Sequence, residues 1–304
     1  MTQSAQNAVH GPRRFGGTGR SRRTAGQSLI VALVLVGFLT AVMGTVTVEL
    51  LTESRISDAR QMEVTVFYLA RAGIETGVNQ LLLAKSPGYE GLSDAWHSSQ
   101  NKELAETPLG DGVYRVAYFD AAAGGERIGI ADEESKLNIN KAEPAMLQRL
   151  DKAFTDDFVK AIVERREQRP FLTLNELNAL KEAPPNFMTK ARESLLTVWG
   201  DGKVNINTAP PAVLASLGMD EEHVKKIEEF RKGTDGAFKT LGDARSYLGM
   251  DDQWLTTSSS HFSIVAQGYL KDTPGIACKL REVVQRGPEG LQVLQFEQLP
   301  LNSR

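Results

Sequence analysis

The first strong pattern along the chain is an apolar run close to its N-terminus. It extends from Ser28 to Leu51, and no charged residue interrupts the 20 positions from Leu29 to Val48. In a helix that rises 1.5 Å per residue, 20 residues span about 30 Å, the thickness of the hydrocarbon core of a bilayer. The pattern therefore predicts a transmembrane helix.

Two other structures give a similar pattern. A buried core helix that is apolar on all sides needs a larger protein around it. A cleavable secretory signal usually has an apolar part of about 7–15 residues, followed by a small-residue cleavage site. Here Glu49 and Glu53 follow the run instead, which favours the membrane anchor.

The helical pattern continues beyond the apolar run. No proline lies between Pro12 and Pro87, so one helix is expected from about Gln27 to about Lys85, with a length of roughly 85–90 Å. Apolar and small residues recur at helical spacing in its second half: Val66, Ala70, Gly73, Gly77 and Leu81. This stripe predicts a seam where a sheet or a second helix packs closely against the backbone. An ordinary amphipathic helix with two tolerated glycines is the alternative.

Strand patterns occur in two separate groups. In the first, Val113–Phe119 alternates, with Tyr114, Val116 and Tyr118 on one face, and Gly124-Gly125 marks a turn into Arg127–Ala131, which predicts a hairpin. The second group lies near the C-terminus and comprises Phe262–Leu270, Ile276–Gln285 and Leu291–Phe296. In its middle strand the apolar face carries Ile276, Cys278, Leu280 and Val284. We expect an antiparallel meander with one solvated face.

An internal repeat separates the two strand groups. KLNINKAEPAMLQRL, from Lys136, matches KVNINTAPPAVLASL, from Lys203, at an offset of 67 residues. Farther on, FVKAIVERR pairs with HVKKIEEFR, and FLTL pairs with FKTL. Each copy is predicted to contain a short helix, an amphipathic helix and a third helix that begins at the Phe-x-Thr-Leu turn. Duplicated units of this kind bury their apolar faces against each other.

The asparagines and phenylalanines that the two copies share are expected to be structural. Capping and Asx-turn hydrogen bonds account for the asparagines more simply than ligand binding does; these are Asn138, Asn140, Asn205 and Asn207. Phe171 and Phe238 are predicted to be core anchors.

The net charge of the whole chain hides a difference between its N-terminal segment and the rest. The 304 residues contain 35 Lys and Arg against 38 Asp and Glu, a net charge of −3. Residues 1–26 hold five arginines and no acidic residue, so this segment is +5 and the rest of the chain is −8. Because basic residues stay on the cytoplasmic side, the N-terminus is expected in the cytoplasm and the rest beyond the membrane. The single cysteine, Cys278, excludes an intramolecular disulfide and is expected to be a buried small hydrophobe.

A basic leader that ends in glycine, followed by a membrane segment fused to a long amphipathic helix, resembles the type IV pilin and pseudopilin superfamily. The resemblance implies cleavage by a prepilin peptidase on the cytoplasmic side, between Gly26 and Gln27 in RRTAGQSLIVAL. The chain departs from the common pattern at two positions, because it has Gln27 first in the mature chain and Val31 fifth, where most pilins have Phe or Met and then Glu.

The missing glutamate is informative. A carboxylate in hydrocarbon costs about 2.5–3.5 kcal/mol on insertion scales, and the family is thought to offset this cost by pairing it with the N-terminal amine of an adjacent subunit. Within the superfamily, its absence is typical of the large K-type minor pseudopilin of type II secretion, which is placed at the pseudopilus tip. In these proteins a helical domain interrupts the pilin-like strands, and DEESKLNIN (Asp132–Asn140) resembles the family's acidic lead-in. A chance loss of the glutamate in another minor pilin is the alternative.

The repeats also resemble helix-hairpin-helix, or SAM-like, modules, including those of competence proteins that bind DNA. Such a hairpin needs a glycine-rich turn whose amides meet phosphate, together with basic residues. Neither LDKAFTDDFVKAI nor LGMDEEHVKKI has one, and both carry acidic residues where the phosphate would lie. We therefore expect no nucleic-acid binding.

Motifs for catalysis are missing from the sequence. It contains no G-x-S-x-G, no G-x-x-x-x-G-K-[ST] and no H-E-x-x-H, and its four histidines are scattered. Calcium is possible at four carboxylates near strand ends, but solvated side chains explain them more simply and we assign no metal ligand or cofactor. These carboxylates are Asp120, Asp132, Glu133 and Glu134.

Together these patterns predict an α+β protein: a long N-terminal helix on a small antiparallel sheet, interrupted by an all-α insert of two SAM-like repeats. The expected parts are a leader (1–26), a transmembrane segment (27–51), a pilin-like first part (52–135), the insert (136–256, repeats at about 136–195 and 203–256) and the C-terminal strands (257–304).

The resemblance implies a non-enzymatic minor pseudopilin that supports pseudopilus assembly and protein export. It is expected to be a single-pass inner-membrane protein with a periplasmic C-terminal domain. The implied partners are I-type and J-type minor pseudopilins, the major pseudopilin and prepilin peptidase, without a small-molecule substrate. The alternatives are a type IV pilus minor pilin and a membrane-anchored DNA receptor of competence.

Overall fold

The computed structural model describes residues 21–84, 88–98, 100–233, 236–249 and 253–301, with side chains from residue 26 onward. Residues 1–20 of the expected leader lie outside the described residues. The chain divides into two compact units, Met1–Arg60 and Gln61–Arg304, and each is described by itself below.

One helix, α1 (Ser21–Leu83), contains the whole apolar run and the amphipathic segment that follows it. It was expected to begin at about Gln27, and it begins six residues earlier, before the expected cleavage bond. Among the residues that the structure describes, Gly26–Leu83 is the helix long and apolar enough to cross a membrane. Proline is absent throughout α1, so its backbone hydrogen bonds are not interrupted.

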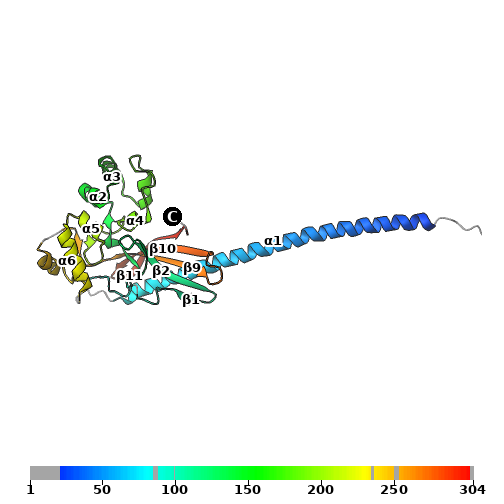
Figure 1. The fold of residues 1–304 in the computed structure, drawn as a ribbon, viewed down its shortest axis with the longest axis horizontal. Helices are drawn as coiled ribbons and strands as arrows, with labels where there is room; N and C mark the ends of the chain where they lie inside the picture. Colours follow the sequence, from blue (N-terminus) through cyan, green and yellow to red (C-terminus); the bar gives the residue numbers. More distant parts are fainter. Residues whose placement is uncertain (1–20, 85–87, 99, 234–235, 250–252, 302–304) are drawn as a thin grey trace, which may run out of the picture. The chain divides into compact units, whose positions relative to one another are not determined.

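The second unit is built on an antiparallel sheet with the strand order β1-β2-β9-β10-β11. Its strands are β1 (Thr107–Leu109), β2 (Gly112–Asp120), β9 (His261–Leu270), β10 (Ala277–Gly287) and β11 (Gly290–Leu299). Two shorter strands, β3 (Gly125–Ile128) and β4 (Ala131–Asp132), pair with β2 and β9. The predicted hairpin and C-terminal meander are therefore confirmed, and Figure 1 shows β2, β9 and β10 side by side.

The seam predicted on α1 packs against this sheet. Gly73 lies against Ala266, and Gly77 lies against Ile264, both on β9. The sheet comes closest to the helix backbone at Gly268, where an added Cβ would lie 2.4 Å from the amide nitrogen of Ala70. Apolar side chains of α1, β2, β9 and β10 enclose the core between helix and sheet. Cys278 belongs to this core and is 3% exposed, as expected.

The repeats form a helical insert between β4 and β9, with its own hydrophobic core. The first copy contains α2 (Pro144–Leu150), α3 (Asp156–Gln168), the 3₁₀ helix η2 (Leu174–Ala179) and α4 (Lys190–Glu193); the second contains α5 (Pro211–Ser216), α6 (Glu221–Lys232) and α7 (Leu241–Leu248). A further 3₁₀ turn, η1 (Glu133–Ser135), leads into the first copy.

Two details of the insert differ from expectation. The third helix of the first copy is a 3₁₀ turn, where Pro184 and Pro185 follow closely and disfavour a longer α-helix. The insert is also not purely helical, because a parallel pair of two-residue strands closes each copy. These pairs are β5 (Leu137–Asn138) with β6 (Leu196–Thr197), and β7 (Val204–Asn205) with β8 (Leu255–Thr256).

Candidate functional site

The bond expected to be cleaved lies inside α1. Gly26 and Gln27 are both exposed and helical, and an atom added at the Cα of Gly26 would meet nothing within 4 Å. Apart from the helix backbone, no described residue meets that added atom, so Gly26 is sterically open at the start of the apolar run.

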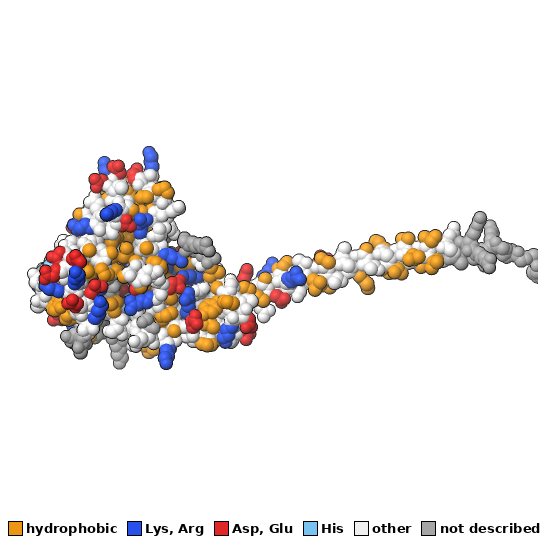
Figure 2. All heavy atoms as spheres, viewed as in Figure 1, with side chains coloured by type: hydrophobic (Ala, Val, Ile, Leu, Met, Phe, Trp, Pro, Cys, Tyr) orange, Lys and Arg blue, Asp and Glu red, His pale blue; other side chains and the backbone are white. Residues whose placement is uncertain are grey.

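The apolar run that follows is exposed along its length. Val31 is 58% exposed, and its neighbours Leu29, Leu33 and Phe38 are 64–65% exposed. On the face shown in Figure 2, hydrophobic side chains follow this first part of α1. The threonine hydroxyls within it donate to carbonyls of the preceding turn, for example Thr40 Oγ1 to Val36 O at 2.7 Å. Such bonds satisfy polar groups without water, as a hydrocarbon environment requires.

The acidic lead-in connects the sheet of the second unit to both repeats. Its first carboxylate, Asp132, is 1% exposed. Asp132 Oδ2 accepts hydrogen bonds from Thr208 Oγ1 at 2.5 Å, Ser259 Oγ at 2.7 Å and Asn205 Nδ2 at 3.2 Å. Burial, reinforced by the negative charge of Glu134, raises the pKa of Asp132 to about 8. This carboxyl thus joins the second repeat to the start of β9.

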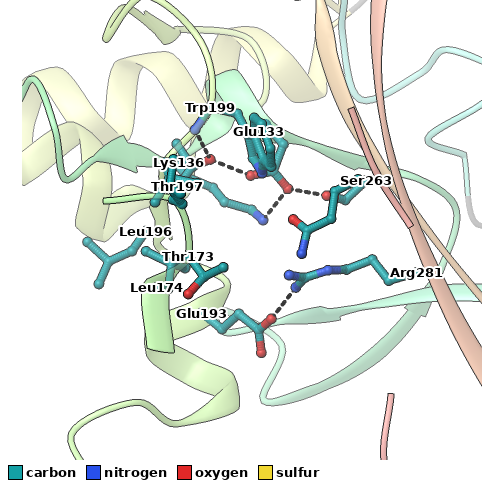
Figure 3. A pocket seen from close by; sticks show the side chains of 13 residues that line it. Glu133, Lys136, Thr173, Leu174, Glu193, Leu196, Thr197, Trp199, Ser263 and Arg281 are labelled. Carbon is teal, nitrogen blue, oxygen red and sulfur yellow. Dashed lines mark hydrogen bonds and ion pairs between the residues drawn. The ribbon is translucent and has the colours of Figure 1, made fainter. Parts of the chain in front are cut away.

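Glu133 makes the corresponding connection for the first repeat. It is 3% exposed and accepts hydrogen bonds from Lys136 Nζ at 2.7 Å, Thr197 Oγ1 at 2.5 Å and Ser263 Oγ at 2.5 Å. Figure 3 shows these side chains converging on its carboxylate. Burial alone would raise the pKa of Glu133, but the ammonium of Lys136 and these hydrogen bonds hold it below its usual range.

Glu134 binds the start of β9. Its Oε2 accepts from the backbone N–H of His261 at 3.0 Å, and its Oε1 accepts from Ser260 Oγ at 2.9 Å and lies 2.8 Å from His261 Nδ1. Ser260 Oγ also contacts Nδ1 of the same histidine, at 3.0 Å. A serine–histidine–carboxylate relay needs the hydroxyl on one ring nitrogen and the carboxylate on the other, so this cluster does not form one.

The expectation that these carboxylates are solvated is wrong for Asp132, Glu133 and Glu134. All three are buried, because side chains from both repeats and from β9 supply enough donors to replace water. Asp120 lies apart from them, where it accepts from the amides of Ala122 and Ala123 in its own turn. No group of three or more His, Cys, Asp or Glu suited to a metal ion occurs among the described residues.

Two of the four asparagines form the Asx-turns that were expected, and the other two have a structural role of another kind. Asn138 and Asn205 each form an Asx-turn, in which the side-chain oxygen accepts from the amide two residues later, at 2.9 Å. Asn140 binds the backbone N–H and C=O of Phe171, and Asn207 binds those of Phe238 in the same way. The two phenylalanines are 2% and 0% exposed, as core anchors should be.

The N-termini of the second helix in each repeat are already occupied. The Thr155 side chain accepts from the amide of Phe158 at the start of α3, and Asp220 accepts from the amide of His223 at the start of α6. Acidic residues fill the first turn of both helices. Amide groups that would face phosphate in a DNA-binding hairpin therefore face carboxylates or a hydroxyl here.

His97 lies in a buried polar cluster that the sequence patterns did not predict. Its Nδ1 donates a hydrogen bond to Ile130 O at 3.2 Å, and its Nε2 accepts one from Tyr118 Oη at 3.1 Å. Burial lowers the pKa of His97 to about 4 and raises that of Tyr118. Trp96, fully buried beside it, packs edge-on against Phe262. The surrounding turn-forming residues gave no sign of this core.

A second missed contact ties α1 to β10. Glu282 is 2% exposed on the strand face that carries Leu280 and Val284, and it accepts from Arg71 at 3.0 Å. Burial outweighs this ion pair and raises the pKa of Glu282. Arg71 also lies over the ring of Phe296, at 5.4 Å from its centroid. The alternation of β10 predicted an apolar face with Ile276, Cys278, Leu280 and Val284, and it gave no sign that Glu282 is buried on the same face.

Comparison with known proteins gives a structural match. No protein-family model and no curated protein sequence matches the chain. A chain from the crystal structure of the GspK-GspI-GspJ complex of the enterotoxigenic Escherichia coli type 2 secretion system has the same fold, with a TM-score of 0.54 and 14% sequence identity. The match covers 82% of this chain and 99% of that chain. The protein therefore shares the fold of a chain of this complex: a long N-terminal helix packed on an antiparallel sheet, with a helical insert between the strands.

Proposed function

We propose that the protein is a K-type minor pseudopilin of a type II secretion system. The observation that carries the proposal is the helical insert of two repeats between β4 and β9 of a pilin-like sheet. This composite fold matches a GspK-GspI-GspJ subunit over 99% of that subunit's length.

In this role α1 anchors the chain in the inner membrane, with the N-terminus in the cytoplasm and the second unit in the periplasm. Prepilin peptidase cleaves between Gly26 and Gln27, where both residues are exposed and Gly26 leaves the position sterically open. The subunit then assembles with I-type and J-type minor pseudopilins and the major pseudopilin. It acts by binding and supports pseudopilus assembly and export across the outer membrane.

Val31 supports a place at the filament tip. It stands where most pilins have a glutamate, and it is exposed on the apolar part of α1. A subunit with no neighbour beyond it has no amine to pair with that glutamate and gains nothing from burying a charge.

Mass analysis of the mature N-terminus tests the assignment. The full chain is expressed with and without prepilin peptidase, and cleavage after Gly26 is expected only with the enzyme. Gly26→Val should block cleavage because a branched side chain fills the open position. Gly37→Val, at another unhindered glycine of the same helix, is the matched control and should be processed normally.

A secretion assay separates the two pilin-like roles. Loss of the protein is expected to reduce export of secreted proteins and to leave surface adhesion and twitching unchanged. An uncleaved chain, or adhesion and twitching defects with normal secretion, would contradict the proposal.

A further inference from the structure

The bond between Gly26 and Gln27 lies within a continuous helix, because α1 begins at Ser21 and runs through both residues. In an α-helix each carbonyl accepts a hydrogen bond from the amide four residues later, so the carbonyl of Gly26 accepts one from the N–H of Ile30. Hydrolysis of this bond requires that a peptidase reach the carbonyl and stabilise the negative charge that develops on its oxygen. The helix must therefore open at this bond before the chain can be cut.

The first two turns of α1 contain residues that weaken a helix. The first turn contains Arg22 and Arg23 and no acidic residue. Because the N-terminal end of a helix carries a partial positive charge, two cations in this turn destabilise it. Gly26 follows in the next turn, and only proline is less favourable than glycine inside a helix. The segment that contains the bond is therefore weakly helical.

A shorter helix can begin directly after the bond. Serine is among the preferred N-cap residues, because its hydroxyl accepts a hydrogen bond from an amide two or three residues later. When residues 21–27 unwind, Ser28 takes this position, and the remaining helix starts with the uncharged run from Leu29 to Val48. Two starts of α1 are thus available, Ser21 and Leu29, and the bond lies inside the helix only with the first of them.

We propose that α1 exchanges between these two starts, that the peptidase cuts the form with the shorter helix, and that Arg22 and Arg23 speed processing by weakening the first turn. The inference rests on the proposed function, because it concerns the cleavage assigned there.

In the form with the shorter helix, the carbonyl of Gly26 is released from the N–H of Ile30. Water then adds across the peptide bond. Its oxygen joins the carbonyl carbon of Gly26, the bond to the nitrogen of Gln27 breaks, and both protons of the water pass to that nitrogen. The leader keeps a carboxylate, and the mature chain begins with an ammonium group. The two arginines position the bond through the helix and take no part in this step.

Processing of the full chain in bicelles by purified prepilin peptidase tests the proposal, with the cleavage rate at excess enzyme followed by mass analysis. Arg22→Glu places an anion at the positive end of the helix and is expected to slow cleavage by about threefold to tenfold. Arg14→Glu makes the same change of charge earlier in the leader and is the matched control, which should be cut at the wild-type rate.

Hydrogen–deuterium exchange of the uncleaved chain, without peptidase, shows whether the helix itself responds. The amides of residues 25–28 should exchange more slowly in Arg22→Glu than in the wild type, by about the factor that separates the cleavage rates. Exchange in Arg14→Glu should match that of the wild type.

Two outcomes overturn the inference alone, when the wild type is cut normally. Slower cleavage of Arg22→Glu with unchanged exchange would mean that the peptidase contacts Arg22 directly. Equal cleavage rates of Arg22→Glu and Arg14→Glu would mean that the first turn of α1 does not limit processing. A wild-type chain that is not cut after Gly26 contradicts the proposed function, and this inference with it.

Discussion

The distance between α1 and the sheet is set by glycines, and Gly268 is the most demanding of them. A Cβ at this position would lie 2.4 Å from Ala70 N and 2.5 Å from Val66 O, which are backbone atoms of the helix. Side chains can turn aside from such a clash, but a helix backbone must shift as a whole. The seam is therefore narrow because the backbones themselves are in contact.

Gly268→Ala is expected to destabilise the protein by about 1–3 kcal/mol, the usual cost of overpacking a core. The measurement is the free energy of unfolding of the full chain in detergent, by chemical denaturation followed with near-ultraviolet circular dichroism. Gly275→Ala is the control, since a Cβ there meets nothing within 4 Å, and its effect should stay within about 0.5 kcal/mol. Equal effects of the two substitutions would show that the seam is not tightly packed.

The buried His97 makes the free energy of unfolding depend on pH in the acidic range. Its folded-state pKa is about 4, whereas an unfolded histidine titrates near pH 6.5. Between these values the unfolded chain binds a proton that the folded chain excludes, so this group lowers the free energy of unfolding as the pH falls from about 6.5 to about 4. In His97→Asn, which keeps a donor for Ile130 O, that contribution is absent.

The measurement for His97 is the difference in unfolding free energy between wild type and His97→Asn across this pH range. Comparing the two proteins cancels the titration of every other group. The advantage of the wild type should shrink as the pH falls. A difference that stays constant from pH 7 to pH 4 would contradict a buried neutral histidine.

Within the insert, equivalent asparagines fasten the start of the third helical segment to the start of each repeat. Asn207 binds both backbone groups of Phe238 and is fully buried, whereas Asn140 binds those of Phe171 and is partly exposed. A lost hydrogen bond costs more where water cannot replace it.

Asn207→Ala is therefore expected to cost about 1–3 kcal/mol of unfolding free energy, and Asn140→Ala clearly less. Each variant is the control for the other, because both remove the pair of bonds to the phenylalanine backbone from equivalent positions. Asn207 also donates to Thr257 O at 3.5 Å, a long bond whose loss acts in the same direction. The prediction fails if Asn140→Ala is the more damaging of the two in chemical denaturation.

The elements that could be predicted from the sequence are those with a regular apolar period. The stripe of α1 and the alternation in β2, β9 and β10 each have one. The two-residue strands β5–β8 are too short for any period, and they form because the ends of each repeat meet in space. Local patterns predict single helices and strands well, and they predict poorly which distant segments pair with each other.

The candidate site shows the same limit. DEESKLNIN was recognisable as an acidic lead-in, but its burial was not predictable. Asp132 is stabilised by Asn205 and Ser259, 73 and 127 residues later in the sequence. Glu282 interrupts an apolar strand face because Arg71, 211 residues away, binds it. Such distant partners leave no trace in a local pattern.

Across the second unit, the acidic lead-in is the joint between the helical insert and the sheet. Its three carboxylates bind the second repeat, the first repeat and β9 in succession, so three adjacent residues hold three parts of the unit. Asp132 is the most buried of them, and Glu134 and Glu90 are the negative charges that act on it. The stability of this joint should therefore follow the protonation of Asp132.

The sign of that dependence follows from the pKa of Asp132, which is about 8 in the folded state and about 3.9 in an unfolded chain. Between these values the folded protein holds a proton that the unfolded chain has released, so this group lowers the free energy of unfolding as the pH rises from about 4 to about 8. Asp132→Asn stays neutral throughout. The hydroxyls of Thr208 and Ser259 can rotate to accept from its amide, whereas the amide of Asn205 loses its acceptor, at a cost that does not change with pH. The unfolding free energy of Asp132→Asn relative to wild type should therefore increase from pH 5 to pH 8, whereas Asp111→Asn, at an exposed aspartate, should show no such trend. A relative stability that is flat or decreasing over this range would mean that Asp132 is already ionised in the folded protein, and that its four hydrogen bonds, including the one from the amide of Glu134, fully compensate its burial.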